Sequence, residues 1–202
     1  RRYWPVVKQD EIWPASYTPI QETGLYYLQS RYYDPTTCRF INAGAAPEFV
    51  EVTGSYDKDS PNCYAFAIGS DTNEQPGVES GREVSDWSDV EDVGASVVLD
   101  LEAKGFSVRE VLGPNSPVND NEFKIVLRVG TSPDPCLLAY KGQEIYDYHF
   151  MVQTSSGCWA EKHGIAGTSI LHENGHSPDR LSWTLHDHDY YDSRIIYYAI
   201  GK

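Results

Sequence analysis

The sequence has little positive charge. Its 202 residues carry 16 Lys and Arg against 30 Asp and Glu, which gives a formal net charge of −14. Proteins that bind nucleic acid usually offer a basic surface to the phosphates, so we expect no nucleic-acid partner and exclude the nucleases. Long hydrophobic runs are also missing, and none approaches the roughly 20 apolar residues of a transmembrane helix. No membrane span is therefore expected.

Cysteine is sparse, with four residues at positions 38, 63, 136 and 158. None belongs to a Cys-x-x-Cys pair, which argues against a zinc site built from thiolates. Four cysteines in 202 residues are also too few for a disulfide scaffold. We therefore expect no metal and no cofactor, and a free cysteine remains available for chemistry.

Aromatic residues dominate a segment near the start of the chain. Residues 22–41 read ETGLYYLQSRYYDPTTCRFI, which predicts two short aromatic strands and a turn at Asp34-Pro35. The motifs ETGLYY, RYYDP and RF resemble the closing segment of RHS/YD-repeat cores. Cys38 stands where that family usually has Gly, and Gly44 where it has an Asp that serves self-cleavage. The resemblance therefore does not carry self-cleavage over to this chain.

That resemblance implies a two-part organisation. Residues 1–44 would be a remnant of the RHS core, and residues 45–202 a variable C-terminal effector, which in such proteins is often a toxin. The implied location is secretion, or delivery into a target cell, as part of a larger bacterial RHS protein. The implied partners are the RHS shell, a protein substrate in the target cell and an immunity protein.

Two helices are predicted after residue 45. Ser60-Pro61 supplies an N-cap and a first helical residue, and Gly69 a stop. A second helix is predicted from Ser88, with Glu91 completing a capping box, to Lys104-Gly105.

Beyond that point the hydrophobic period changes to two, as in strands. The segments that read as strands are 106–112, 123–129, 145–153, 158–162, 169–172 and 194–200. Helices followed by strands predict an α+β fold, with the helices packed on an antiparallel sheet.

Cys63 is the first candidate catalytic residue. With Ser60 as N-cap it would be the third helical residue, close to the free amides and the positive end of the helix dipole, which stabilise a thiolate. The alternative is an inert buried cysteine in the apolar run CYAFAI.

His149 lies on the predicted strand 145–153 and would serve as the base. A three-residue loop 155–157, with Gly157 in the left-handed region, sets Met151 against Glu161 and His149 against His163. Glu161 would then lie diagonally across from His149, with His163 as its rival. A four-residue loop would instead place Lys162 opposite His149.

These residues carry a second resemblance. Asn-Cys63-Tyr-Ala-Phe-Ala is similar to the start of the papain helix, and DYHFMVQTSSGCWAEKHG resembles the DYHWYRQ…GxWSHKPG stretch of papain-like RHS C-terminal domains. It implies a papain-like fold and a cysteine peptidase, amidase or deamidase in which Cys63 is the nucleophile, His149 the base and Glu161 the third residue. Glu161 stands where that pattern has His, which leaves the third residue open.

The same resemblance implies the reaction. The Cys63 thiolate would attack the acyl carbon of a protein amide, and His149 would protonate the leaving amine. The backbone amide of Cys63 would meet the oxyanion. Asp57 stands where papain has a donor Gln, so the second donor is unassigned.

Two other functions compete with this one. His172, Glu173 and His176 satisfy the His-Glu-x-x-His pattern of zinc hydrolases, but Asn174-Gly175 favours a turn over the required helix. The other alternative is a non-catalytic binding module on the same fold. His186 and His188 could form an adventitious metal site, although a polar turn is favoured. The acidic stretch 71–102 is interpreted as a solvated face that could meet a basic partner.

Overall fold

The computed structural model describes residues 18–20, 25–28, 31–34, 39–40, 46–52, 54 and 57–201, the first four ranges by their backbone alone. Those first four ranges form an antiparallel sheet in the order β1-β2-β3-β4. Its strands are β1 (Thr18–Ile20), β2 (Leu25–Leu28), β3 (Arg31–Asp34) and β4 (Arg39–Phe40). The two predicted aromatic strands correspond to β2 and β3. Cys38 and Gly44 lie outside the described residues.

The helix α1 (Cys63–Ile68) begins two residues later than its predicted cap implied. Asn62 is the N-cap, and its Oδ1 accepts a hydrogen bond from the Ala65 N–H at 2.9 Å. The prediction of Ser60 as the cap was wrong, because the Asn62 side chain reaches the third helical amide and starts the helix there. The catalytic candidate is therefore the first helical residue, not the third. Gly69 ends the helix in the left-handed region with φ 74°, as predicted.

The helix α2 (Val90–Ala103) is capped by Asp89, whose side chain accepts from the Glu91 N–H at 3.0 Å. The predicted start at Ser88 was thus one residue early. The helical period of the sequence is confirmed, because one face of α2 is buried against the sheet. The fully buried valines and leucine of that face are Val93, Val97 and Leu101.

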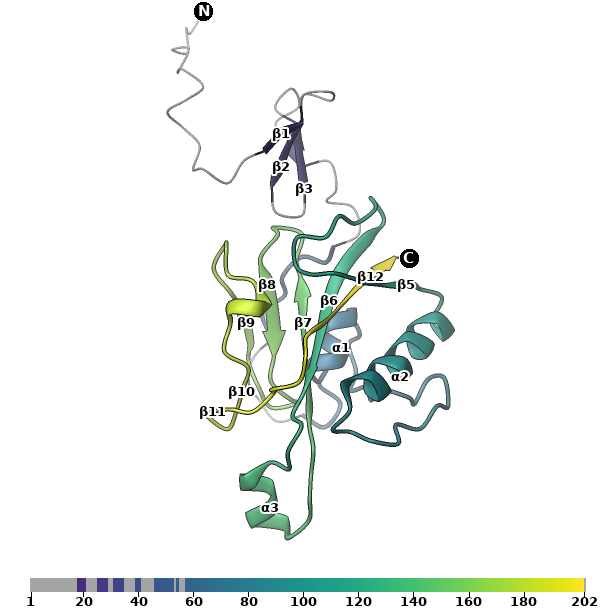
Figure 1. Ribbon diagram of the computed structural model, residues 1–202, viewed down its shortest axis with the longest axis vertical. Helices are drawn as coiled ribbons and strands as arrows, with labels where there is room; N and C mark the ends of the chain where they lie inside the picture. Colours follow the sequence, from purple (N-terminus) through teal and green to yellow (C-terminus); the bar gives the residue numbers. More distant parts are fainter. Residues whose placement is uncertain are drawn as a thin grey trace, which may run out of the picture.

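All six predicted strands form one antiparallel sheet, in the order β5-β12-β6-β7-β8-β9. They are β5 (Ser107–Val111), β6 (Glu122–Val129), β7 (Tyr148–Gln153), β8 (Trp159–Lys162), β9 (Ser169–Leu171) and β12 (Ile196–Gly201). The prediction of an α+β fold is confirmed, with α1 and α2 beside the same sheet (Figure 1).

The register of β7 and β8 is the one predicted from the three-residue loop. Met151 pairs with Glu161, and the Thr154 N–H donates to the Cys158 carbonyl at 2.8 Å. Gly157 takes the left-handed conformation with φ 85°. Since one residue of slip would turn every side chain to the other face, this register decides which polar groups meet.

The two faces of the sheet bury different clusters. Tyr148, Phe150 and Val152 of β7 pack with the helices, whereas Met151 belongs to a second cluster on the opposite face. The segment 178–191 covers that second face and contributes three aromatic side chains to it, namely Trp183, Tyr190 and Tyr191. His149 alternates with Tyr148 and Phe150 and therefore points to the second face.

Several short elements were not predicted. These are α3 (Pro135–Lys141), the 3-10 helix η1 (Pro178–Arg180), β10 (Thr184–Leu185) and β11 (His188–Asp189). β10 and β11 pair as a hairpin. α3 lies in an arm between β6 and β7 that extends beyond the sheet (Figure 1), and none of its residues is buried. In the described part of the chain, no helix has both the length and the apolar character needed to cross a bilayer.

Candidate active site

A pocket of about 760 Å³ opens where the start of α1 meets the start of β7 and the end of β8. Cys63 and His149 both line it, as does His163. The remaining wall comes from the loop 71–86, the loop after β8 and the hairpin of β10 and β11. The two catalytic candidates that are 86 residues apart in sequence therefore share one cavity.

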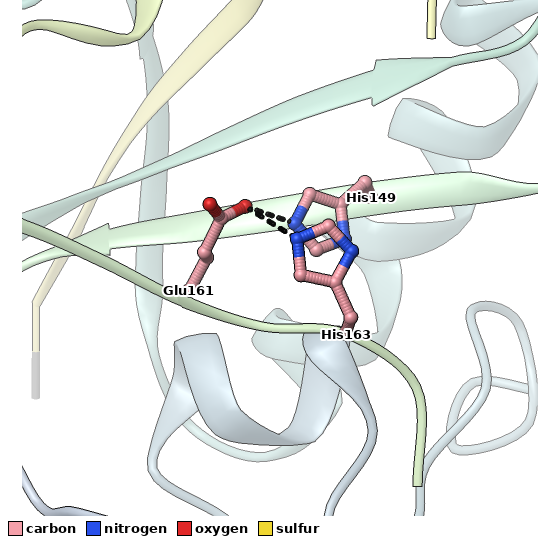
Figure 2. A group of neighbouring side chains, drawn as sticks. All are labelled: His149, Glu161 and His163. Carbon is pink, nitrogen blue, oxygen red and sulfur yellow. Dashed lines mark hydrogen bonds and ion pairs between the residues drawn. The ribbon is translucent and has the colours of Figure 1, made fainter. Parts of the chain in front are cut away.

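The predicted third residue, Glu161, contacts the predicted base. Its Oε2 lies 2.5 Å from His149 Nε2, and both side chains are almost completely buried. The rival candidate, His163, also reaches this carboxylate, with its Nε2 3.3 Å from the same oxygen. Figure 2 shows both rings turned toward Glu161 with their Nε2 atoms. Glu161 and His163 are alternatives on the sequence alone, but both contact His149 in the structure.

A third imidazole completes this group. His172 Nε2 lies 2.8 Å from Glu161 Oε1, the other carboxylate oxygen. The ring of His149 is also held from its sides, because it stacks on His163 with 4.4 Å between centroids and on Tyr191 with 5.3 Å. His149 Nδ1 is thus the nitrogen left without a partner in the described residues, and it is the one available to a thiol or a substrate.

Electrostatics fix the charges in this cluster. Burial alone would raise the pKa of Glu161, but its hydrogen bonds to His149, His163 and His172 hold that pKa well below its usual range. The hydrogen bond to Glu161 raises the pKa of His163 in turn, against the effect of burial. Glu161 is therefore a carboxylate at neutral pH, able to orient an imidazole and to stabilise an imidazolium.

The sulfur of Cys63 lies beside the backbone of His149. The thiol donates to the Tyr148 carbonyl oxygen at 3.6 Å, and the N–H of Phe150 is directed at the same sulfur. These two residues flank His149 in β7. In the described structure the thiol bonds to this backbone and not to the imidazole, so the nucleophile and the base are adjacent but not yet paired.

The thiol is protonated in this environment. Burial raises the pKa of Cys63, and the charge of Asp147 raises it further, while the N–H groups of Phe150 and Tyr64 lower it in part. As the first residue of α1, Cys63 also carries a backbone N–H that has no partner within the helix. That N–H is the predicted first donor to an oxyanion.

Gln75 is a candidate that the sequence did not reveal. Its Oε1 accepts from the Tyr148 hydroxyl at 2.5 Å, and that hydroxyl in turn accepts from Asn62 Nδ2 at 3.2 Å. These hydrogen bonds fix the orientation of the Gln75 amide, Nε2 makes no hydrogen bond within the described residues, and Gln75 lines the pocket. Asn62 is not available, because Nδ2 also donates to the Glu74 carbonyl. Gln75 lies in a polar loop without a pattern that could have identified it.

One group of side chains in the described residues has the spacing of a metal site. Nitrogen and oxygen atoms of His149, Glu161 and His163 lie within 4.8 Å of one another. The same atoms already bond to each other, and His149 Nε2 and Glu161 Oε2 are too close, at 2.5 Å, to hold an ion between them without moving. The observed arrangement is a hydrogen-bonded imidazole–carboxylate cluster.

The alternative zinc ligands are not brought together. Residues 172–176 contain no helix, and the His176 N–H closes a turn on the Glu173 carbonyl at 3.1 Å. His172 bonds to Glu161, whereas His176 lines a separate pocket. The predicted turn at Asn174-Gly175 is confirmed, and it keeps His172 and His176 apart, so the structure does not support the His-Glu-x-x-His alternative.

The second pair of histidines is also split. His186 and Asp187 form the tight turn between β10 and β11, and both have left-handed backbone angles, with φ 49° and 64°. Both line the pocket beside Cys63. His188 instead directs Nδ1 to the His186 carbonyl at 3.3 Å, so the two imidazoles do not share a face as an extended segment would require.

The chain matches no family model, no curated protein and no solved structure. The fold and the site define an α+β protein in which a buried cysteine and a buried histidine line one pocket and a buried glutamate contacts that histidine.

Proposed function

We propose that this protein is a cysteine-dependent hydrolase or acyltransferase of the papain-like type that acts on protein amides. The observation that carries the proposal is the His149–Glu161 hydrogen bond of 2.5 Å at the wall of the pocket that Cys63 also lines. A base oriented by a buried carboxylate beside a cysteine is the arrangement that thiol catalysis requires.

In the proposed reaction the Cys63 thiol leaves the Tyr148 carbonyl and gives its proton to His149 Nδ1. Such contacts often tighten only when substrate is bound. The thiolate attacks the acyl carbon, the C–N bond breaks, and His149 returns the proton to the leaving amine. Water, or an amine in a transamidation, then cleaves the thioester.

Two donors are available for the oxyanion. The first is the backbone N–H of Cys63, which α1 leaves unpaired. The second is Nε2 of Gln75, which the Tyr148 hydroxyl orients through Oε1. The proposal therefore assigns to Gln75 the second oxyanion donor that the sequence left open.

The biological setting is proposed from the RHS-like motifs in residues 22–41. The chain would be the end of an RHS protein whose effector part, residues 45–202, is delivered into a target cell as a toxin. Its partners would be the RHS shell, a protein substrate and an immunity protein.

The test compares Cys63→Ala with Cys136→Ala, because Cys136 is exposed and does not line the pocket. The full chain is incubated with a protein extract, and new N-termini, released ammonia and new isopeptide bonds are measured. These readouts separate peptidase, deamidase and transamidase activity. Cys63→Ala should abolish the active readout, and Cys136→Ala should retain it. Activity that persists in Cys63→Ala would overturn the proposal.

The alternative is a non-catalytic binding module. It is favoured by one observation, namely that the buried Cys63 thiol donates to a backbone carbonyl as an inert cysteine would. Under this alternative no readout appears in the wild-type chain, and Cys63 reacts with alkylating agents no faster than an ordinary thiol.

A further inference from the structure

Lys162 is a buried cation without an acidic partner. It is the last residue of β8 and is 0% exposed. Its ammonium donates to the Gly164 carbonyl at 2.6 Å, and it forms no ion pair with a carboxylate among the described residues. An ammonium has three donors, and a buried charge is unfavourable unless it is paired. A negative charge close to the Lys162 ammonium would therefore be stabilising.

The strand register places Lys162 at the end of β8 that lies near Cys63. The last pair of β7 and β8 is Met151 with Glu161, so Lys162 follows this pair on β8, and on β7 the same end continues to Tyr148, whose carbonyl contacts the Cys63 sulfur. The N–H of Phe150 is the one directed at the sulfur. Alternation along β8 also puts Lys162 on the face opposite to Glu161, which is the face that packs against α1.

The charge of Lys162 is coupled to that of Cys63. Burial lowers the pKa of Lys162, and the neighbouring Cys63 raises it in part. The other ionisable groups coupled to the sulfur are Asp147, Tyr148 and Tyr191. Asp147 is an acid and the two tyrosines carry no positive charge, while His149 is the base that receives the proton of the thiol. Among these groups Lys162 is thus the cation beside the thiol.

We propose that Lys162 is the counter-charge that stabilises the thiolate of Cys63 after His149 has taken its proton. This inference rests on the proposed function. Lys162 takes no part in the proton transfer and touches no substrate, so it is a positioning residue. Its bond to Gly164 also ties the thiolate to the loop after β8, which lines the pocket.

The experiment measures the rate at which iodoacetamide alkylates Cys63 in the full chain between pH 5 and 10, read by peptide mass spectrometry. Only the thiolate reacts. Lys162→Met should raise the pKa of this thiol by about one unit or more, which is a tenfold loss of rate at neutral pH. Lys162→Gln keeps a donor for Gly164 and removes the charge, so it should show the same loss.

Lys124→Met is the matched control. Lys124 is also 0% exposed and also donates to a single backbone carbonyl, that of Pro114 at 2.6 Å, but its charge interacts with Arg109 rather than with Cys63. It should leave the pH profile of Cys63 unchanged. If Lys162→Gln alkylates like wild type, or if Lys124→Met shifts the profile equally, the inference is overturned.

This readout is separate from turnover. A shifted thiol pKa in Lys162→Gln together with full turnover in Cys63→Ala would support the counter-charge and refute the proposed function. An unshifted pKa together with loss of turnover in Cys63→Ala would do the opposite.

Discussion

A single carboxylate, that of Glu161, accepts from three imidazoles. An ionised carboxylate has about four acceptor positions on two oxygens, and here one oxygen serves His149 and His163 while the other serves His172. The ring of His149 is therefore fixed by bonding at one nitrogen and by stacking on His163 and Tyr191, with Nδ1 left for chemistry. At the residue scale, the site depends on this one side chain more than on any other partner of His149.

Glu161→Gln should destabilise the fold in a pH-dependent way. The low pKa of Glu161 stabilises the native state above the usual glutamate pKa, and this contribution disappears as the pH falls. The raised pKa of His163 stabilises it below the usual histidine pKa, and this contribution disappears as the pH rises. The difference in unfolding free energy should therefore be largest between about pH 4.5 and 6.5, at about 3 kcal/mol.

Urea denaturation of both chains across pH 4 to 9 measures that difference. His163→Gln serves as the control. It should remove the decline of the stability difference above pH 6.5, and it should keep the decline of that difference at acidic pH, which comes from Glu161. A difference that is flat across the range would contradict the assigned charges.

Gln75→Glu should lower kcat about 10²- to 10³-fold, the usual loss for one oxyanion donor. Glu keeps an acceptor for the Tyr148 hydroxyl and the same shape, but it has no N–H for the oxyanion. The new carboxylate should also raise the pKa of the Cys63 thiol, as the charge of Asp147 does, and the alkylation rate of Cys63 measures that effect separately. A Gln75→Glu chain with normal kcat would show that the second donor lies elsewhere.

At the scale of elements, the turn of β10 and β11 combines backbone strain with a position at the pocket. Two consecutive residues in the left-handed region are typical of a type I′ hairpin turn, which normally carries Asn-Gly. Here the turn is His186-Asp187, with φ 49° and 64°. Backbone strain of this kind collects at functional sites, and both residues line the pocket.

Replacing His186-Asp187 by Asn-Gly should therefore stabilise the protein by about 1 kcal/mol, because the strain is relieved. Gly157→Ala should destabilise it by a similar amount, because an Ala with φ 85° is strained. An added Cβ has nothing within 4 Å, so no steric clash contributes to the effect. The melting temperatures of the two variants should thus move in opposite directions. A lower melting temperature for the Asn-Gly variant would mean that the turn side chains make stabilising contacts.

The sequence predicted elements where one local rule decided the outcome. Alternating side chains and a left-handed Gly157 were enough to derive the β7–β8 register, and with it the contact between His149 and Glu161. The start of α1 was wrong because two capping candidates, Ser60 and Asn62, stand close together, and only the folded chain shows which side chain reaches a free amide. The helix α3 was overlooked, although Asp134 and Pro135 are ordinary start signals.

Other features depend on contacts that no local pattern encodes. His172 was considered only as a zinc ligand, yet the pairing of β8 with β9 carries it to Glu161. Gln75 acquires its orientation from Tyr148, 73 residues away. Tertiary contacts between distant segments therefore determined the part of the site that sequence periodicity could not supply.

At the scale of the whole molecule, negative charge extends into the pocket. The chain carries a net charge of −14, and Asp147 and Asp187 line the pocket while no Lys or Arg does so in the described structure. Long-range attraction should therefore favour basic substrates, and salt should weaken that preference.

The corresponding prediction concerns peptides that differ only in the residues around a reactive amide. With lysines there, kcat/KM should fall several-fold between about 20 and 300 mM salt, and with glutamates it should rise. Asp187→Asn should weaken the dependence of kcat/KM on salt for both peptides. Equal slopes for the two peptides would show that the approach to the pocket is electrically neutral.

The last strand of the sheet, β9, is protected by the segment that leads into the domain. The Ser169 N–H donates to the Val52 carbonyl at 3.0 Å, and the Val52 N–H donates to Ser169 Oγ at 2.7 Å. An uncovered edge strand pairs readily with other chains, and β9 carries the exposed Ile170 and Leu171. Residues 46–52 thus cover part of this edge, so a chain that lacks them should associate through β9 and lose its monodispersity.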